Sequence, residues 1–237
     1  LDAFTTTSAA NIADLNALLN NAEGVVTVDI TDSVNQYSVL TSASNQLDTS
    51  NGNNGNTHVV TVNFGTQAVG GDSITNLNDL AGQAAITSIT GSLTSVTKTN
   101  VDDLSSDLDT DNSTVSFSLK TDSDGLLSVS QATGLLSHTD QTANGVSIVY
   151  GGGITGDLSD YVSAGSEEVS TLMQAVITED GDAALTVADS QLTTAANIKD
   201  LNALASLSSG VVTATVVTDK GNLLGASDGA TLGTLDT

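Results

Sequence analysis

The residues of this sequence best suited to chemistry are aspartates at alternating positions. They form three short stretches, two of them with a glycine: Asp107, Asp109 and Asp111; Asp122 and Asp124 before Gly125; and Asp180 and Asp182 around Gly181. Alternate carboxylates in a loop can converge on one hard cation, and glycine permits the sharp turn that this requires. These aspartates are therefore the candidate metal ligands, with calcium as the candidate cofactor.

Two observations limit the calcium prediction. The first stretch begins like an EF-hand loop, but Asn112 stands at the glycine position and Ser118 at that of the bidentate glutamate. An EF-hand is therefore excluded. Aspartate is also a frequent turn and cap former, so a purely structural role stays open at each stretch.

Catalytic residues are scarce. The chain has two histidines, His58 and His138, and no cysteine, which leaves little for zinc binding or nucleophilic catalysis. The glycine-rich "YGGGITGD" (150–157) lacks the lysine of a phosphate-binding loop. We therefore predict that the protein is not an enzyme and that both histidines are polar loop residues.

Composition limits the partners further. Over 237 residues the chain carries 28 acidic side chains against four basic ones, a formal net charge of −24. Such a chain cannot neutralise phosphates, which excludes nucleic acid and anionic membrane surfaces as partners. No apolar stretch approaches the roughly 18 residues of a membrane span, so we expect no membrane insertion. With aromatic residues at 3%, the core is expected to consist of aliphatic side chains.

The elements that position these residues are clearest in a duplicated segment. The sequence "AANIADLNALLNNAEGVVTVDITD" (9–32) returns near the other end as "AANIKDLNALASLSSGVVTATVVTD" (195–219). In the first copy Ile12, Leu15 and Leu18 have helical spacing, Gly24 ends the helix, and the residues from Val26 onward alternate as in a strand. Each copy is therefore predicted to be a helix, a glycine turn and a strand.

The same order recurs less clearly between the two copies. Strands are expected to begin near residues 25, 59, 86, 115, 146, 175 and 211, a mean spacing of roughly 31 residues. This spacing predicts a repetitive α/β or β-rich array, solenoid-like, of about seven units, each a short helix followed by a strand. The array would be one repeat-built module over residues 1–237, or subdivide into 1–70 and 71–237 at Gly70–Gly71. The alternatives are β-sandwich domains or two small α/β domains.

The unit "TTAANIKDLNAL…GVVTATVVTD" resembles repeats of large secreted bacterial surface proteins, especially the surface-layer-like and hemolysin-type calcium-binding proteins of cyanobacteria. The resemblance covers residues 6–32 and 193–219. It implies a non-enzymatic extracellular protein of the bacterial cell surface, often calcium-dependent, that coats cells or forms sheets and fibres.

We therefore predict an extracellular structural protein that self-assembles into a cell-surface layer or filament. The expected partner is a further copy of the chain, because exposed terminal strands can pair with the next copy. Calcium would then relieve the repulsion between aspartates of neighbouring subunits. The alternative is an adhesin or fibre module that binds glycans or another surface.

Overall fold

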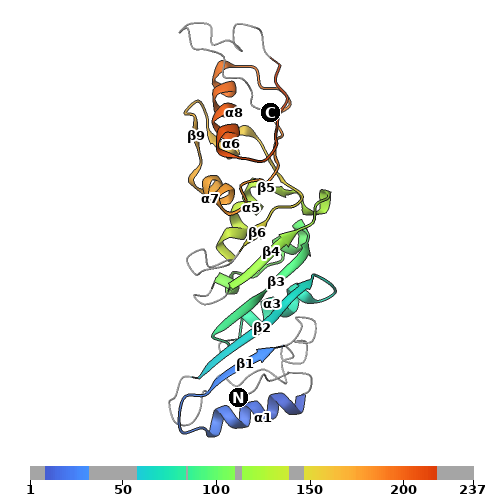
Figure 1. Ribbon diagram of the computed structural model, residues 1–237, viewed down its shortest axis with the longest axis vertical. Helices are drawn as coiled ribbons and strands as arrows, with labels where there is room; N and C mark the ends of the chain where they lie inside the picture. The colour runs from blue at the N-terminus through green and yellow to red at the C-terminus, as the bar shows by residue number, and fades with distance from the viewer. Residues whose placement is uncertain (1–8, 32–57, 84, 110–113, 139–146, 218–237) are drawn as a thin grey trace. The chain divides into compact units, whose positions relative to one another are not determined.

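The computed structural model describes residues 9–31, 58–83, 85–109, 114–138 and 147–217. Within them the chain forms a five-stranded sheet of order β1-β2-β3-β4-β6, a four-stranded sheet of order β11-β10-β7-β5, and a two-stranded hairpin, β8–β9 (Figure 1). The pairs β1–β2 and β2–β3 are parallel, as are β5–β7, β7–β10 and β10–β11.

The strands of these sheets are mostly short. They are β1 (Thr27–Thr31), β2 (Val59–Ala68), β3 (Ser88–Val96), β4 (Thr114–Leu119), β5 (Leu127–Ser128), β6 (Ile148–Val149), β7 (Ile154–Gly156), β8 (Val162–Ser163), β9 (Glu168–Val169), β10 (Leu185–Val187) and β11 (Val212–Thr213). The α-helices are α1 (Ala9–Asn21), α3 (Ser73–Ala81), α4 (Lys98–Asp102), α5 (Val129–Leu135), α6 (Leu158–Tyr161), α7 (Thr171–Glu179) and α8 (Ala195–Leu207). Short 3₁₀ helices cover Ser106–Asp109 (η1), Ser123–Gly125 (η2) and Leu136–His138 (η3).

The predicted array of about seven helix–strand units is wrong, and so is the β-sandwich alternative. The protein is mixed α/β, its strands are divided between separate parallel sheets, and its contacts define two compact units. A strand is predicted to begin near residue 175, but Thr171–Glu179 is helix α7, which buries Met173, Val176 and Ile177 at helical spacing. Strands β5, β7 and β10 have only two or three residues, too few to show an alternating pattern.

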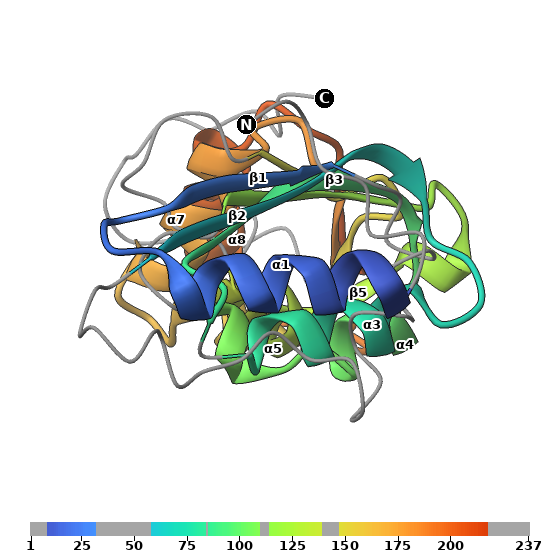
Figure 2. The ribbon, with the colours of Figure 1, turned by 90° about the horizontal axis from the view of Figure 1, so that it is seen from below.

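The first unit comprises Leu1–Ser118 and Ser137–Val146. Its parallel strands alternate as predicted for β1, where Val28 and Ile30 are buried and Thr27 and Asp29 are exposed. Helices α1 and α3 lie on the same face of the sheet (Figure 2). Both bury an apolar stripe at helical spacing, so the core of this unit lies between the helices and the sheet.

His58 joins α1, β1 and the start of β2. The backbone N–H of Val26 donates to Nδ1 of His58 (3.0 Å), and Nε2 lies 2.8 Å from the carbonyl oxygen of Leu19. Because Val26 can only donate and Leu19 can only accept, the imidazole carries its proton on Nε2. His58 lies in a loop before β2, as predicted, but it is buried and its ring binds two backbone groups.

The second unit comprises Leu119–Leu136 and Ser147–Thr237, and its core includes aromatic side chains. Tyr150 and Tyr161 are among the largest fully buried residues, so the prediction of a purely aliphatic core is wrong. The hydroxyl of Tyr161 donates to the carbonyl oxygens of Ile154 (3.0 Å) and Thr186 (3.1 Å), on the neighbouring strands β7 and β10. Burial raises the pKa of both phenols, which stay protonated as hydrogen-bond donors.

Candidate functional site

The first predicted calcium stretch lies around the 3₁₀ helix η1. The side chain of Asp107 is exposed, and its Oδ2 accepts a hydrogen bond from the hydroxyl of Ser105 (3.0 Å). Asp111 lies outside the described residues, as does the side chain of Asp109. For this stretch, calcium binding stays a prediction.

In the second stretch, both carboxylates have partners from the protein. Asp122 caps η2, and its Oδ1 accepts from the backbone N–H of Asp124 (3.0 Å). Oδ2 of Asp124 pairs with Nζ of Lys120 at 3.4 Å on an exposed part of the surface. Gly125 is needed for a backbone contact, because a Cβ there would lie 2.0 Å from the carbonyl oxygen of Lys120. The arrangement is that of a capped turn.

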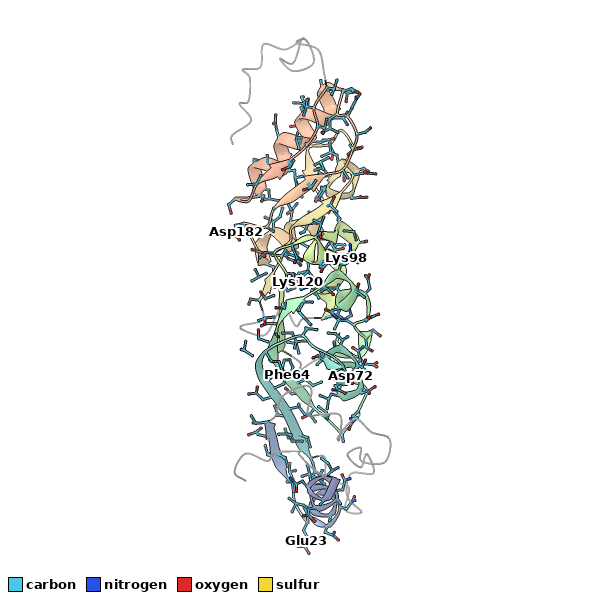
Figure 3. All side chains as sticks on the ribbon, turned by 90° about the vertical axis from the view of Figure 1, so that its right-hand side faces the viewer. Glu23, Phe64, Asp72, Lys98, Lys120 and Asp182 are labelled. Atoms are coloured by element: carbon cyan, nitrogen blue, oxygen red, sulfur yellow. The ribbon has the colours of Figure 1, made fainter. Side chains whose placement is uncertain are left out.

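In the third stretch, Asp180 and Asp182 come together. Oδ2 of Asp180 accepts from the backbone N–H of Tyr150 (2.6 Å). Partial burial raises the pKa of Asp180; the Tyr150 hydrogen bond opposes the rise, and the neighbouring Asp182 and Glu179 add to it. Asp182 itself is exposed at the surface (Figure 3). In the part of the chain that the structure describes, no group of three or more metal-ligating side chains could hold an ion.

Sequence reasoning missed a different use of the acidic residues. In the second unit, carboxylates accept hydrogen bonds from backbone N–H groups of a segment about thirty residues earlier, and the charge of the acceptor strengthens such bonds. Oε1 of Glu179 binds the N–H of Ile148 (2.8 Å), and Oδ2 of Asp189 binds that of Leu158 (2.6 Å).

Asp200 of α8 is the most buried of these carboxylates. It is 3% exposed and accepts from the backbone N–H groups of Gly165 (2.7 Å) and Glu167 (2.9 Å), in the turn between β8 and β9. Both donors have positive φ angles, 72° at Gly165 and 60° at Glu167, so the carboxylate holds a turn that is strained at the non-glycine residue. The sequence indicated this role only by placing an acidic residue next to Leu201, on the apolar side of a predicted helix.

The outer edge of β1 has no strand partner among the described residues. The N–H of Val59 donates to the carbonyl oxygen of Val26 (2.9 Å), so Val26 faces β2. Because successive residues of a strand face opposite edges, the backbone groups of Val25, Thr27 and Asp29 face away from β2. Among the described residues, no strand pairs with this edge of β1.

The outer edge of β11 is open in the same sense. The N–H of Leu185 donates to the carbonyl oxygen of Val211 (2.9 Å), so Val211 and Thr213 face β10 and Val212 faces away. Over the described residues, β11 is the last strand of its sheet. Within the described residues, each sheet thus has one end strand, β1 or β11, that belongs to the duplicated segment and has no partner on its outer edge.

Comparison with known proteins gives no match, either to a protein-family model, to a curated protein or to a solved structure. No described helix combines the length and the apolar character needed to cross a membrane. We therefore infer the function from the geometry of the strand edges and the chemistry of the side chains.

Proposed function

We propose that the protein is a structural protein that assembles head to tail with further copies of itself, by pairing β11 of one copy with β1 of the next. The observation that carries the proposal is a pair of strand edges without a described partner, formed by Thr27 and Asp29 on β1, with Val25 just before it, and by Val212 on β11. An unpaired strand edge presents a row of hydrogen-bonding groups that favours strand addition. Because the two edges are different surfaces, the contact is heterologous, and it continues as a filament unless the rotation closes a ring.

The acidic surface supports a bacterial cell-surface location and a dependence on calcium as parts of the same proposal. With a net charge of −24, copies of the chain repel one another. Divalent cations would reduce this repulsion between exposed carboxylates such as Asp107, Asp124 and Asp182. Calcium would then promote assembly from the solvent side, without a preformed binding site.

The test is negative-stain electron microscopy and light scattering of the purified protein, with millimolar calcium and then with excess chelator. We expect ordered filaments or sheets in calcium. Assemblies that persist in chelator would support the structural function and contradict its dependence on calcium. Monodisperse particles in both conditions would contradict self-assembly and direct attention to glycan binding.

Proline variants test whether the strand edges make the contact. The N–H of Thr27 faces away from β2, and that of Val212 faces away from β10. Thr27→Pro and Val212→Pro therefore remove only an outward donor, as proline does on edge strands. We expect both variants to fold, by circular dichroism, and to stay monomeric. Normal assembly of both would show that the contact lies elsewhere.

A further inference from the structure

The two copies of the duplicated segment bury opposite sides. Over residues 9–18 and 195–204 they differ only at Ala13 and Lys199, yet equivalent side chains have different surroundings. We call the side of α1–β1 formed by Asp14, Leu18, Gly24 and the backbone of Val25 the leading face. Its equivalents in α8–β11 are Asp200, Leu204, Gly210 and Val211.

Asp14 and Asp200 show the difference in hydrogen bonding. Asp200 is buried and receives the N–H groups of Gly165 and Glu167. Asp14 is exposed, and no group among the described residues donates to it. Asp14 thus stands at the same helical position as Asp200, but its carboxylate oxygens are available to accept hydrogen bonds.

Leu18 and Leu204 show the difference in packing. Leu204 is 0% exposed, in a helix that contacts α6, β8 and β9. Leu18, which stands one turn after Asp14, is 41% exposed. A leucine on an exposed helix face is costly to leave in water, whereas its equivalent is fully covered.

Gly24 and Gly210 show the difference in backbone approach. At Gly210 a Cβ would lie 2.2 Å from the carbonyl oxygen of Ala183, so only glycine allows that contact. At Gly24 a Cβ would meet nothing within 4 Å. The first copy therefore has the glycine that close backbone packing needs, without a described neighbour to pack against.

On the other side of the two segments the difference in burial is the reverse: the first copy is buried and the second is more exposed. In the first copy Ile12 and Leu19 are buried, and His58 binds the backbone of Leu19 and Val26. Their equivalents Ile198 and Ala205 are only partly buried, and Val212, the equivalent of Val26, faces the open edge of β11. Each open side thus has an equivalent in the chain that is engaged.

We infer that the leading face of α1–β1 is the acceptor surface for a second copy of this chain, and that the open side of α8–β11 is what it accepts. This inference rests on the proposed head-to-tail assembly and assigns it residues. Each of the two open sides is equivalent in sequence to a side of the other copy that packs against neighbouring elements within the chain. The two open sides would therefore form the two halves of a similar contact between one copy of the chain and the next.

Gly24→Ala is the sharpest test, because the substitution has no steric cost in the free chain. We expect unchanged circular dichroism and melting temperature, and a critical concentration for assembly raised about tenfold or more. The matched control is Gly70→Ala, another glycine with nothing within 4 Å of its Cβ position. Asp14→Ala, compared with Asp79→Ala on the exposed side of α3, tests the carboxylate in the same way.

A mixing experiment tests the polarity of the contact. Gly24→Ala blocks the leading face, and Val212→Pro blocks the open side of α8–β11. Each variant alone is expected to stay monomeric, whereas an equimolar mixture should form dimers that grow no further, measured by light scattering coupled to size exclusion. Failure of the mixture to dimerise would overturn the inference.

The outcomes separate the inference from the proposed function. If the unmodified protein does not assemble, self-assembly itself is contradicted. If it assembles and Gly24→Ala and Asp14→Ala behave like their controls, assembly stands but the leading face is not its acceptor. The inference also requires that Gly24→Ala folds normally. A Gly24→Ala variant that loses assembly because it no longer folds would therefore contradict it.

Discussion

The ring of Phe64 on β2 occupies the space that a side chain on Gly91 of β3 would need. A Cβ at position 91 would lie 2.5 Å from two ring carbons, and the φ angle of Gly91 is 153°. Both the contact and the backbone conformation exclude other residues. The Phe64 ring therefore packs directly against the backbone of β3 at Gly91.

Gly91→Ala is therefore expected to lower the free energy of unfolding by about 2–4 kcal/mol, from overpacking and backbone strain together. Urea denaturation followed by circular dichroism measures the change. Adding Phe64→Leu to Gly91→Ala should recover part of the loss, since the two residues are in contact. Strict additivity of the two substitutions would argue against the contact.

His58→Phe is expected to destabilise the first unit. The ring volume is retained, but the carbonyl oxygen of Leu19 and the N–H of Val26 lose their partner. Each buried group left without a hydrogen bond costs about 1–3 kcal/mol. Hydrogen exchange should show faster exchange at Val26 than in the unmodified protein. A stability equal to that of the unmodified protein would contradict the bridging role of the imidazole.

Asp200→Ala and Asp14→Ala should differ although they replace the same residue in duplicated helices. Loss of the Asp200 carboxylate frees the turn at Gly165 and Glu167 and is expected to cost about 2 kcal/mol. Asp14→Ala should change stability by no more than about 0.5 kcal/mol, as for other exposed sites. Thermal unfolding of the monomers, below their assembly concentration, makes the comparison. Equal effects would show that burial does not distinguish the two positions.

Asp180 should make stability fall as pH rises through the acidic range. Its pKa in the folded protein is raised above the ordinary value of 3.8, mainly by burial. The folded state then holds the proton more tightly than the unfolded state, so the free energy of unfolding decreases as pH rises from 3.8 through the raised pKa.

Asp180→Asn removes this dependence and keeps an amide oxygen for the N–H of Tyr150. We expect a flatter profile of melting temperature against pH than for the unmodified protein. Asp122→Asn, at an exposed turn, serves as the control. An unchanged profile for Asp180→Asn would contradict the assigned titration.

Part of the fold could be predicted from the sequence because some elements are long and strongly periodic. The stripes of α1 and α8, with Leu15 and Leu201 buried at the predicted positions, are examples. The segment around α7 could not be assigned in this way. Its short apolar run from Ala175 to Ile177 fits a strand as well as a helix. In the structure it belongs to a helix that buries Met173, Val176 and Ile177.

The open edges were expected in general terms, from the idea that terminal strands invite a partner. Their residues were not predictable, because which of Val25 and Val26 faces outward depends on the register with β2. The role of Asp200 was equally hidden, since its donors come from a hairpin more than thirty positions earlier in the sequence. The alternating aspartates indicated calcium binding. In the structure, several acidic side chains instead accept hydrogen bonds from backbone N–H groups.

The histidine bridge also has a consequence for the order in which the chain folds during synthesis. Leu19 and Val26 leave the ribosome well before His58, the residue that binds both of them. These two hydrogen bonds of the first copy can therefore form only after residue 58 has been translated. The second copy emerges when Gly165, Glu167 and Ala183, its contacts, are already in place. The contacts of two similar stretches thus become available at different times, late for the first copy and at once for the second.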